Sequence, residues 1–280
     1  MSKPEVSEEK AVPLVSIVVP VYRKDDSELF IGAVNSLLRQ TYENLEVVIV
    51  VDGPLSAALD LGLESFLDQA RVRVIRQPSN QGVSVARNLG VQACRGKYIG
   101  FLDADDFSVP ERIDIQLRYL RKNDLDLVSS YLSLRDDKGD MVGIRKIPVH
   151  YAQVRRLVLL SCPIHNTAVL ARASVLKDHQ FAESMSVAED YDLWVRLLIL
   201  GYRLGNVPEP LVIYTQPDAS ISKRRGIEYA KADFRVKWNC RRLVNVFLTP
   251  VVFLVAGATF FARLLPRALF NPLYSLRKRI

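Results

Sequence analysis

Short, continuous apolar runs alternate with longer amphipathic segments along the first half of the chain. Runs rich in β-branched residues are typical of buried strands, and they occupy residues 14–19, 45–51, 72–75, 97–102 and 126–134. Segments with apolar residues at helical spacing occupy residues 28–39, 56–69, 83–94 and 111–122. This alternation predicts an α/β fold with a doubly wound, mostly parallel, Rossmann-like sheet.

The residues that follow the predicted strands are candidates for chemistry. In a sheet of this kind a ligand binds outside the carboxyl ends of the strands. Three of these ends lead into Tyr22, Asp52 and the pair Asp103 and Asp105. We therefore expect an aromatic ring and three carboxylates at one edge. The sequence contains no GxGxxG, no GxxxxGK[ST] and no GxSxG pattern, so a dinucleotide site, a P-loop and a hydrolase elbow lose their support.

Three carboxylates stand within four residues at Asp103, Asp105 and Asp106. They repel one another, so a positive group is expected among them. A divalent cation such as Mn²⁺ or Mg²⁺ suits this pattern, because it binds one or two carboxylates together with phosphate oxygens. The alternative is a solvated turn in which an Asp caps the next helix.

Composition and charge narrow the class of protein. The 280 residues are 49% hydrophobic and 25% charged, as in a folded globular protein. Seven basic residues and no acidic residue lie between Arg241 and Ile280, and they account for the whole formal charge of +7. A neutral body argues against nucleic-acid binding. The three cysteines form no CxxC pair, which indicates neither a disulfide framework nor a zinc site.

Five motifs in order carry a resemblance to a known family. They read VSIVVPVY at 15–22, VDG at 51–53, NQGVSVARN at 80–88, GKYIGFLDADD at 96–106 and AEDYDLW at 188–194. Together they resemble the family 2 glycosyltransferases of the GT-A fold, over about residues 13–222. The resemblance implies a hexosyltransferase-type enzyme that uses a nucleotide sugar, with UDP as the expected nucleotide, and that inverts the anomeric carbon.

The resemblance also assigns roles to single residues. It places Pro20, Val21 and Tyr22 along the nucleotide base, Asp52 at the uracil or its equivalent, Gly82 and Arg87 beside the nucleotide, and Asp103 near the ribose. Asp105 would ligate the metal that bridges the diphosphate. Asp190 would be the general base that takes the proton of the acceptor hydroxyl.

Each of these residues also has a purely structural interpretation. Tyr22 could pack in the core, Asp52 could form the turn before Gly53, and Arg87 could make a surface ion pair. Residues after Asp190 have helical spacing, so Asp190 lies in the first turn of a helix, where an acidic side chain is favoured by about 0.3–1 kcal/mol through the helix dipole alone.

The sequence departs from the family in two places. Processive members carry a Gln-x-x-Arg-Trp element, which Arg235-Val236-Lys237-Trp238 does not match, so we expect transfer of a single sugar. Many relatives have a histidine where this chain has Pro217. Positive charge for the diphosphate could come from Lys223, Arg224 and Arg225, which could equally form a solvated loop.

The C-terminal segment predicts contact with a membrane. Residues 243–262 contain no charged residue over 20 positions, and basic residues flank them, which suits an anionic inner membrane surface. The alternative is a terminal helical hairpin packed on the catalytic domain or on a second subunit. We expect a loose leader at 1–12 without a signal peptide, a catalytic domain at 13–225 and a membrane-associating tail at 226–280.

The predicted function is sugar transfer to a glycan or lipid-linked acceptor in surface polysaccharide assembly, at the cytoplasmic face of the membrane. Two other functions compete with it. A sugar nucleotidyltransferase would carry a Gly-rich N-terminal loop, which Ser16–Lys24 lacks. A non-catalytic, membrane-bound protein that binds sugar nucleotides would not need Asp190.

Overall fold

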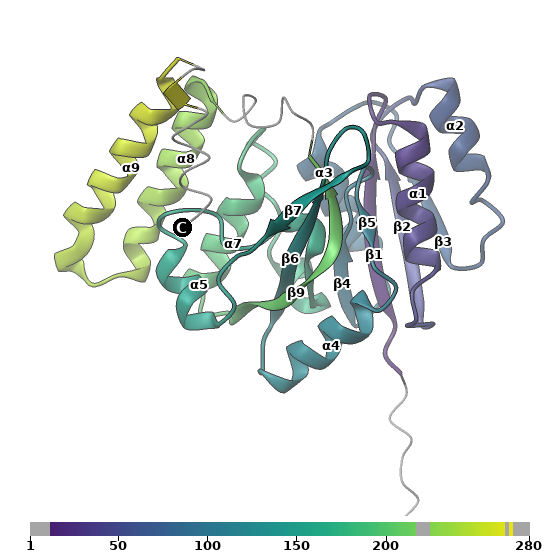
Figure 1. Ribbon diagram of the computed structural model, residues 1–280, viewed down its shortest axis with the longest axis horizontal. Coiled ribbons are helices and arrows are strands. Elements are labelled where there is room, and N and C mark those ends of the chain that lie inside the picture. Colours follow the sequence, from purple (N-terminus) through teal and green to yellow (C-terminus); the bar gives the residue numbers. More distant parts are fainter. Residues whose placement is uncertain (1–11, 217–224, 267–268, 271–280) are drawn as a thin grey trace, which may run out of the picture.

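A nine-stranded sheet forms the centre of the molecule in the computed structural model, which describes residues 12–216, 225–266 and 269–270 (Figure 1). Its strand order is β3-β2-β1-β4-β8-β6-β9-β5, with β7 paired to β6. The strands are β1 Val15–Val21, β2 Leu45–Val51, β3 Val72–Arg76, β4 Tyr98–Phe101, β5 Phe107–Ser108, β6 Leu127–Arg135, β7 Met141–Arg145, β8 Leu170–Arg172 and β9 Leu204–Thr215.

Helices cover both faces of the sheet, so the body has three layers. The helices are α1 Ser27–Leu38, α2 Ala57–Glu64, α3 Val83–Ala93, α4 Arg112–Lys122, α5 Tyr151–Leu157, α6 Ala173–Asp178, α7 Glu189–Ile199, α8 Ile227–Asn239 and α9 Thr249–Leu264, with short 3₁₀ turns η1 Asn166–Ala168, η4 Cys240–Leu243 and η5 Val246–Leu248. Apolar residues of α1, α2 and α4 form one core cluster with one face of β1, and those of α3, α6 and α7 form a second cluster with its other face. Adjacent residues of β1 therefore point into different layers, as Ile17 and Val18 do.

The first four strands in space are parallel, and this brings their carboxyl ends to one edge. β1 pairs in parallel with both β2 and β4, and β2 pairs in parallel with β3. The other half of the sheet is mixed, because β8 runs antiparallel to both β4 and β6 while β9 runs parallel to β6. The α/β fold is confirmed, and its parallel character belongs to the half that the apolar runs predicted.

All five predicted strands and four predicted helices are present, as β1, β2, β3, β4 and β6 and as α1 to α4. Most elements after residue 135 were not predicted from the sequence. The C-terminal segment forms a helical hairpin of α8 and α9, and α8 contributes Val236 to the core cluster of α7. Helix α8 therefore packs on the catalytic domain, as the alternative of a terminal hairpin expected. One stretch, Val246–Leu264, is long and apolar enough to cross a membrane by length and composition alone.

Candidate active site

A cleft of about 300 Å³ opens at the carboxyl ends of β1, β2 and β4. All eight residues predicted for the nucleotide and the metal line this cleft. They are Pro20, Val21, Tyr22, Asp52, Gly82, Arg87, Asp103 and Asp105. Asn80, Val83, Ala86 and Ala104 complete the lining. The parallel strands thus bring together residues that are more than 80 positions apart in the chain.

Tyr22 stands at the mouth of this cleft. Its side chain is 40% exposed, so the interpretation as a core residue is wrong. The backbone N–H of Tyr22 donates to the carboxylate of Asp25 at 2.9 Å, which fixes the turn after β1. An exposed ring on a fixed turn is suited to stack against a planar base.

Asp52 holds the loop that leads into α3. Its Oδ1 accepts a hydrogen bond from the N–H of Gln81 at 2.7 Å, and its Oδ2 accepts one from the N–H of Gly82 at 2.9 Å. The next residue, Gly53, has φ +84°, and a Cβ there would lie 2.5 Å from the backbone nitrogen of Asn80. Asp52 therefore does more than form the turn before Gly53, since its hydrogen bonds also hold Gly82 at the wall of the cleft.

Asp52→Asn should weaken the binding of a nucleoside diphosphate by about tenfold, because the amide cannot accept from both N–H groups. Titration calorimetry measures this change. Asp136→Asn is the matched control, since Asp136 also accepts from two backbone N–H groups, both at Oδ1, in the turn between β6 and β7. Equal affinities for the wild type and Asp52→Asn would contradict the role of this loop.

Arg87 lines the cleft and links the segment after β4 to the start of α7. One Nη donates to Oδ1 of Asp103 at 2.9 Å, and the other donates to Oε1 of Glu189 at 2.9 Å. Only 7% of the Arg87 side chain is exposed, so the interpretation as a surface ion pair is wrong. Burial acts to lower the pKa of Arg87, but the charges of Asp103 and Glu189 outweigh it and raise the pKa. We call this arrangement the Arg87 bridge.

Arg87→Met should lower the free energy of unfolding by about 3 kcal/mol, because it leaves two carboxylates facing each other without their cation. Turnover should fall as well, since Glu189 precedes Asp190 in α7. Denaturant unfolding gives the stability change, and Arg76→Met is the control. Arg76 makes an ion pair of the same length with Asp60, but both partners are largely exposed, so its loss should cost at most about 1 kcal/mol. Equal losses in the two variants would contradict the bridge.

Carboxylates outnumber cations where β4 ends. Burial, and then the charge of Asp103, raises the pKa of Asp105 to about 6. Burial also raises the pKa of Asp25 to about 7, and the charges of Asp105 and Asp103 add to this against the lowering effect of the Tyr22 N–H. Asp25 was not predicted from the sequence, although it belongs to the acidic pair Asp25-Asp26 that follows β1.

This donor set fits a divalent cation that shares its ligands with a phosphate. Burial is the first cause that raises the pKa of Asp105 and of Asp25, and the neighbouring carboxylates raise both further, so a cation placed among them would favour their ionised forms. Among the described residues, no three His, Cys, Asp or Glu side chains are grouped to hold a metal ion on their own. Mg²⁺ and Mn²⁺ sites of the open type need only one or two carboxylates, and Asp105 can provide one.

Asp106 has a different task from its neighbours. It is fully buried, and its Oδ1 accepts a hydrogen bond from the N–H of Thr215 at 2.9 Å. It therefore ties the end of β4 to the end of β9 and does not cap α4, which corrects the expectation of a helix cap. Burial, and then the charges of Asp105 and Asp103, raises the pKa of Asp106 well above its ordinary value.

Arg135 is a cation that the sequence motifs did not indicate. It ends β6, stacks on the ring of Phe107 at 4.4 Å, and donates to Oγ1 of Thr215 at 3.2 Å. Its charge lowers the pKa of Asp105. Of the predicted cations, Arg225 instead donates to the carbonyl of Leu265 at the end of α9, while Lys223, Arg224 and Pro217 lie outside the described residues.

Asp190 lies in the first turn of α7, where the spacing placed it, and outside the lining of the cleft. Ala188, at the N-cap, has φ 58°, a left-handed conformation that costs an L-residue about 1–2 kcal/mol. Such strain persists only where the surroundings impose it. The preceding loop is held by α3, because Asn88 exchanges hydrogen bonds of 3.0 and 2.9 Å with the backbone of Phe181. The sequence could have indicated Asn88, because it directly follows Arg87 in the motif at residues 80–88.

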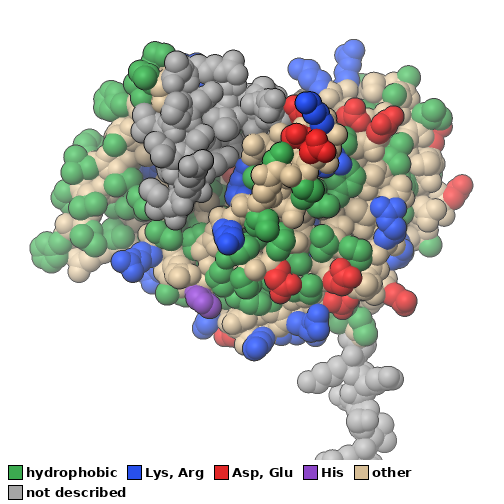
Figure 2. Space-filling model, in the orientation of Figure 1, with side chains coloured by type: hydrophobic (Ala, Val, Ile, Leu, Met, Phe, Trp, Pro, Cys, Tyr) green, Lys and Arg blue, Asp and Glu red, His purple; other side chains and the backbone are tan. Residues whose placement is uncertain are grey.

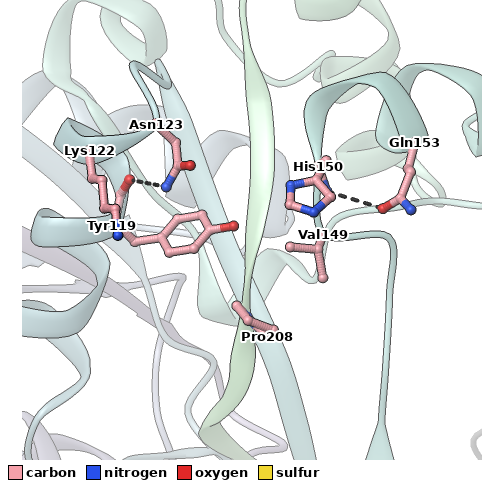
Figure 3. Close-up of a pocket in the computed structure, with 7 residues that line it drawn as sticks. All are labelled: Tyr119, Lys122, Asn123, Val149, His150, Gln153 and Pro208. Atoms are coloured by element: carbon pink, nitrogen blue, oxygen red, sulfur yellow. Dashed lines mark hydrogen bonds between the residues drawn. The ribbon is translucent and has the colours of Figure 1, made fainter.

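A second hollow of about 480 Å³ lies away from this cleft, where α4 ends and α5 begins (Figure 3). Tyr119 and His150 face each other across it, and Pro208 of β9 lies at its floor. It contains one cation, Lys122, and no carboxylate. None of the predicted site residues lies there.

The fold and the cleft define a glycosyltransferase of the GT-A type. The profile of glycosyl transferase family 2 matches residues 16–176, so the chain belongs to this family and is a transferase of class EC 2.4. Both sequence-based expectations, the family and the fold, are confirmed.

Three known proteins are similar to this chain, the first in sequence and the other two in fold. The O-antigen biosynthesis glycosyltransferase WbnJ of Escherichia coli is 27% identical, over 86% of this chain and 94% of its own. The structure of S. aureus TarS 1–349 with UDP-GlcNAc superposes with a TM-score of 0.67 at 19% identity, covering 89% of this chain and 72% of that TarS fragment. The mannosyltransferase PcManGT from Pyrobaculum calidifontis, with GDP-Man and Mn²⁺, gives 0.63 at 14% identity, over 89% and 74% of the two chains.

Proposed function

We propose that this glycosyltransferase moves a single sugar from a UDP-linked donor to a glycan or lipid-linked acceptor during surface polysaccharide assembly. The observation that carries the proposal is the meeting of all eight predicted donor-site residues in one cleft. The sequence similarity to WbnJ, an O-antigen biosynthesis glycosyltransferase, supports a role in polysaccharide assembly. The fold shared with TarS, whose structure contains UDP-GlcNAc, supports a UDP-sugar as the donor.

The donor occupies the cleft with its base against Tyr22, Pro20 and Val21. Asp52 holds the loop of Gly82, whose backbone approaches the nucleotide. Asp103 is oriented toward the ribose by the Arg87 bridge. Asp105 would hold a Mn²⁺ or Mg²⁺ ion, and such an ion acts as a Lewis acid that stabilises the charge of the departing diphosphate.

Asp190 is the general base for the acceptor. Its carboxylate takes the proton of the acceptor hydroxyl as the hydroxyl oxygen bonds to the anomeric carbon. The bond from that carbon to the diphosphate oxygen breaks at the same time, and the electron pair leaves with the nucleoside diphosphate. A single displacement of this kind inverts the anomeric configuration.

The C-terminal hairpin places the enzyme at the cytoplasmic face of an anionic membrane. The basic residues from Arg241 onward support this, apart from Arg263, which pairs with Asp233, since each contributes about 1 kcal/mol near such a surface. The enzyme would then meet a lipid-linked acceptor at the membrane in which that acceptor is anchored.

Hydrolysis of a panel of nucleotide sugars with Mn²⁺ tests the donor proposal. We expect one UDP-sugar to be cleaved and GDP-sugars to be spared. Nuclear magnetic resonance of the sugar product transferred to an added acceptor gives the anomeric outcome. Cleavage of a GDP-sugar alone would overturn the nucleotide assignment, and activity undiminished in excess EDTA would overturn the metal.

A further inference from the structure

Helices α8 and α9 form a hairpin in which the start of α8 is hydrogen-bonded to the end of α9. At its open end the N–H of Gly226 donates to the carbonyl of Arg263 at 3.0 Å, and Arg225 donates to the carbonyl of Leu265 at 2.7 Å. Along its length Phe234 of α8 packs edge-on against Phe253 and Phe260 of α9. The two helices are therefore antiparallel and packed side by side, as Figure 1 shows.

A buried group of three charges fixes the hairpin further. Asp233 accepts from Nζ of Lys237 at 2.7 Å and from a guanidinium nitrogen of Arg263 at 2.9 Å. The side chains of Asp233 and Lys237 are at most 3% exposed and that of Arg263 is 11% exposed, so separating α9 from α8 would remove Arg263 from its buried partner. Burial opposes the ionised form of Asp233, but the two cations outweigh it and lower the pKa of Asp233.

The outer face of α9 is apolar and uncovered among the described residues. Phe247 is 85% exposed, Leu254 is 68% and Phe261 is 69%. Val246, Leu248, Val251, Phe253 and Leu264 are also exposed on this element and on η5. Hydrophobic side chains accordingly gather along the edge of the molecule that α9 forms (Figure 2). A patch of this kind marks an interaction surface.

We propose that this outer face lies flat in the interface of an anionic lipid membrane, and that α9 does not cross the bilayer. The inference rests on the proposed membrane contact and says how that contact is made. The apolar stretch Val246–Leu264, formed by η5 and α9, has 19 residues and is long enough to cross, so its length does not decide between the two arrangements. The attached α8 does, because a crossing would carry it into the hydrocarbon together with its exposed Glu228, Lys231 and Arg235.

Charge favours lipid over a second copy of the chain as the occupant of this face. Arg241 and Arg242 lie just before the apolar stretch, and four basic residues follow Arg263 in the sequence without any acidic residue, whereas Arg263 itself is paired with Asp233. Two copies meeting through this face would bring two such basic segments together. An anionic lipid surface would instead neutralise them while it covers the apolar side chains.

Depth measurements on the full-length chain test the flat arrangement. A fluorophore is attached at residue 247, 254 or 261, one at a time, in a Cys162→Ser background, since Cys94 and Cys240 are buried. Quenching by lipids brominated at different depths is read in phosphatidylglycerol-containing vesicles. A flat helix puts the three labels at one shallow depth, whereas a crossing helix would separate the first and last by about 20 Å.

Leu254→Glu with Phe261→Glu should reduce sedimentation with these vesicles by at least tenfold. Leu61→Glu with Leu67→Glu is the matched control, because Leu61 and Leu67 are exposed on the far side of the body. A stepwise depth profile would overturn the proposal, and so would a dimer in sedimentation velocity that only the α9 variant dissociates. Hydrolysis of the donor in detergent solution is read in the same preparations, so a failure of the lipid contact is distinguished from a failure of the proposed catalysis.

Discussion

Asp190→Asn should lower turnover by at least about 100-fold while the affinity for the donor stays within about threefold. The amide keeps an oxygen that can accept the N–H of Tyr191, as Oδ1 of Asp190 does at 2.7 Å, so the start of α7 should survive. It cannot accept a proton from the acceptor hydroxyl, and this loss acts only in the transition state. Steady-state kinetics with saturating acceptor, beside calorimetry of donor binding, separates the two effects.

Asp192→Asn serves as the control for this variant. Asp192 shares the first turn of α7, but its carboxylate pairs with Arg196 at 2.7 Å. We expect some loss of stability from Asp192→Asn and turnover within about threefold of the wild type. If the Asp190→Asn enzyme retains more than about a tenth of wild-type turnover, Asp190 is not the general base and serves only to stabilise the start of α7.

Asp105→Asn should abolish most Mn²⁺-dependent binding of the nucleoside diphosphate and reduce activity by orders of magnitude. Its melting temperature without metal should not fall, because the substitution removes one of several carboxylates that repel one another at the end of β4. Titration of Mn²⁺ in the presence of UDP, followed by calorimetry, measures the first effect, and thermal scans in EDTA measure the second.

Asp60→Asn is a suitable reference for this experiment, since Asp60 is exposed and pairs only with Arg76 among the ion pairs of the described chain. It should leave Mn²⁺-dependent binding unchanged. Should Asp105→Asn bind UDP and Mn²⁺ as tightly as the wild type, the metal would have to lie elsewhere in the chain.

The half of the fold that could be predicted consists of elements with a strong local pattern. β1 and β2 are continuous apolar runs, and α1 has its apolar residues at helical spacing. β5 and β8 have two and three residues, too few for any period to show. β9 contains Pro208 and Pro210, which normally argue against a strand. Its pairing with β6 shifts register beside these prolines, which is how the strand accommodates them.

The candidate site divides in the same way. Residues at the ends of parallel strands could be predicted, because the topology alone brings Tyr22, Asp52 and Asp103 together. Glu189 and Arg135 could not, because their partners come from α3 and β9 and depend on how the second half of the sheet folds back. Long-range contacts of this kind leave no period in the sequence.

The Arg87 bridge also has an evolutionary consequence. One guanidinium pairs with two carboxylates that lie on different elements, so replacing Arg87 leaves both acids without their cation, and replacing either acid leaves the buried guanidinium with only one partner. Lineages that lose the arginine should therefore have lost or neutralised Asp103 and Glu189 as well. We expect positions 87, 103 and 189 to covary as a triplet among relatives, and relatives with a lysine at position 87 to keep only one of the two acids.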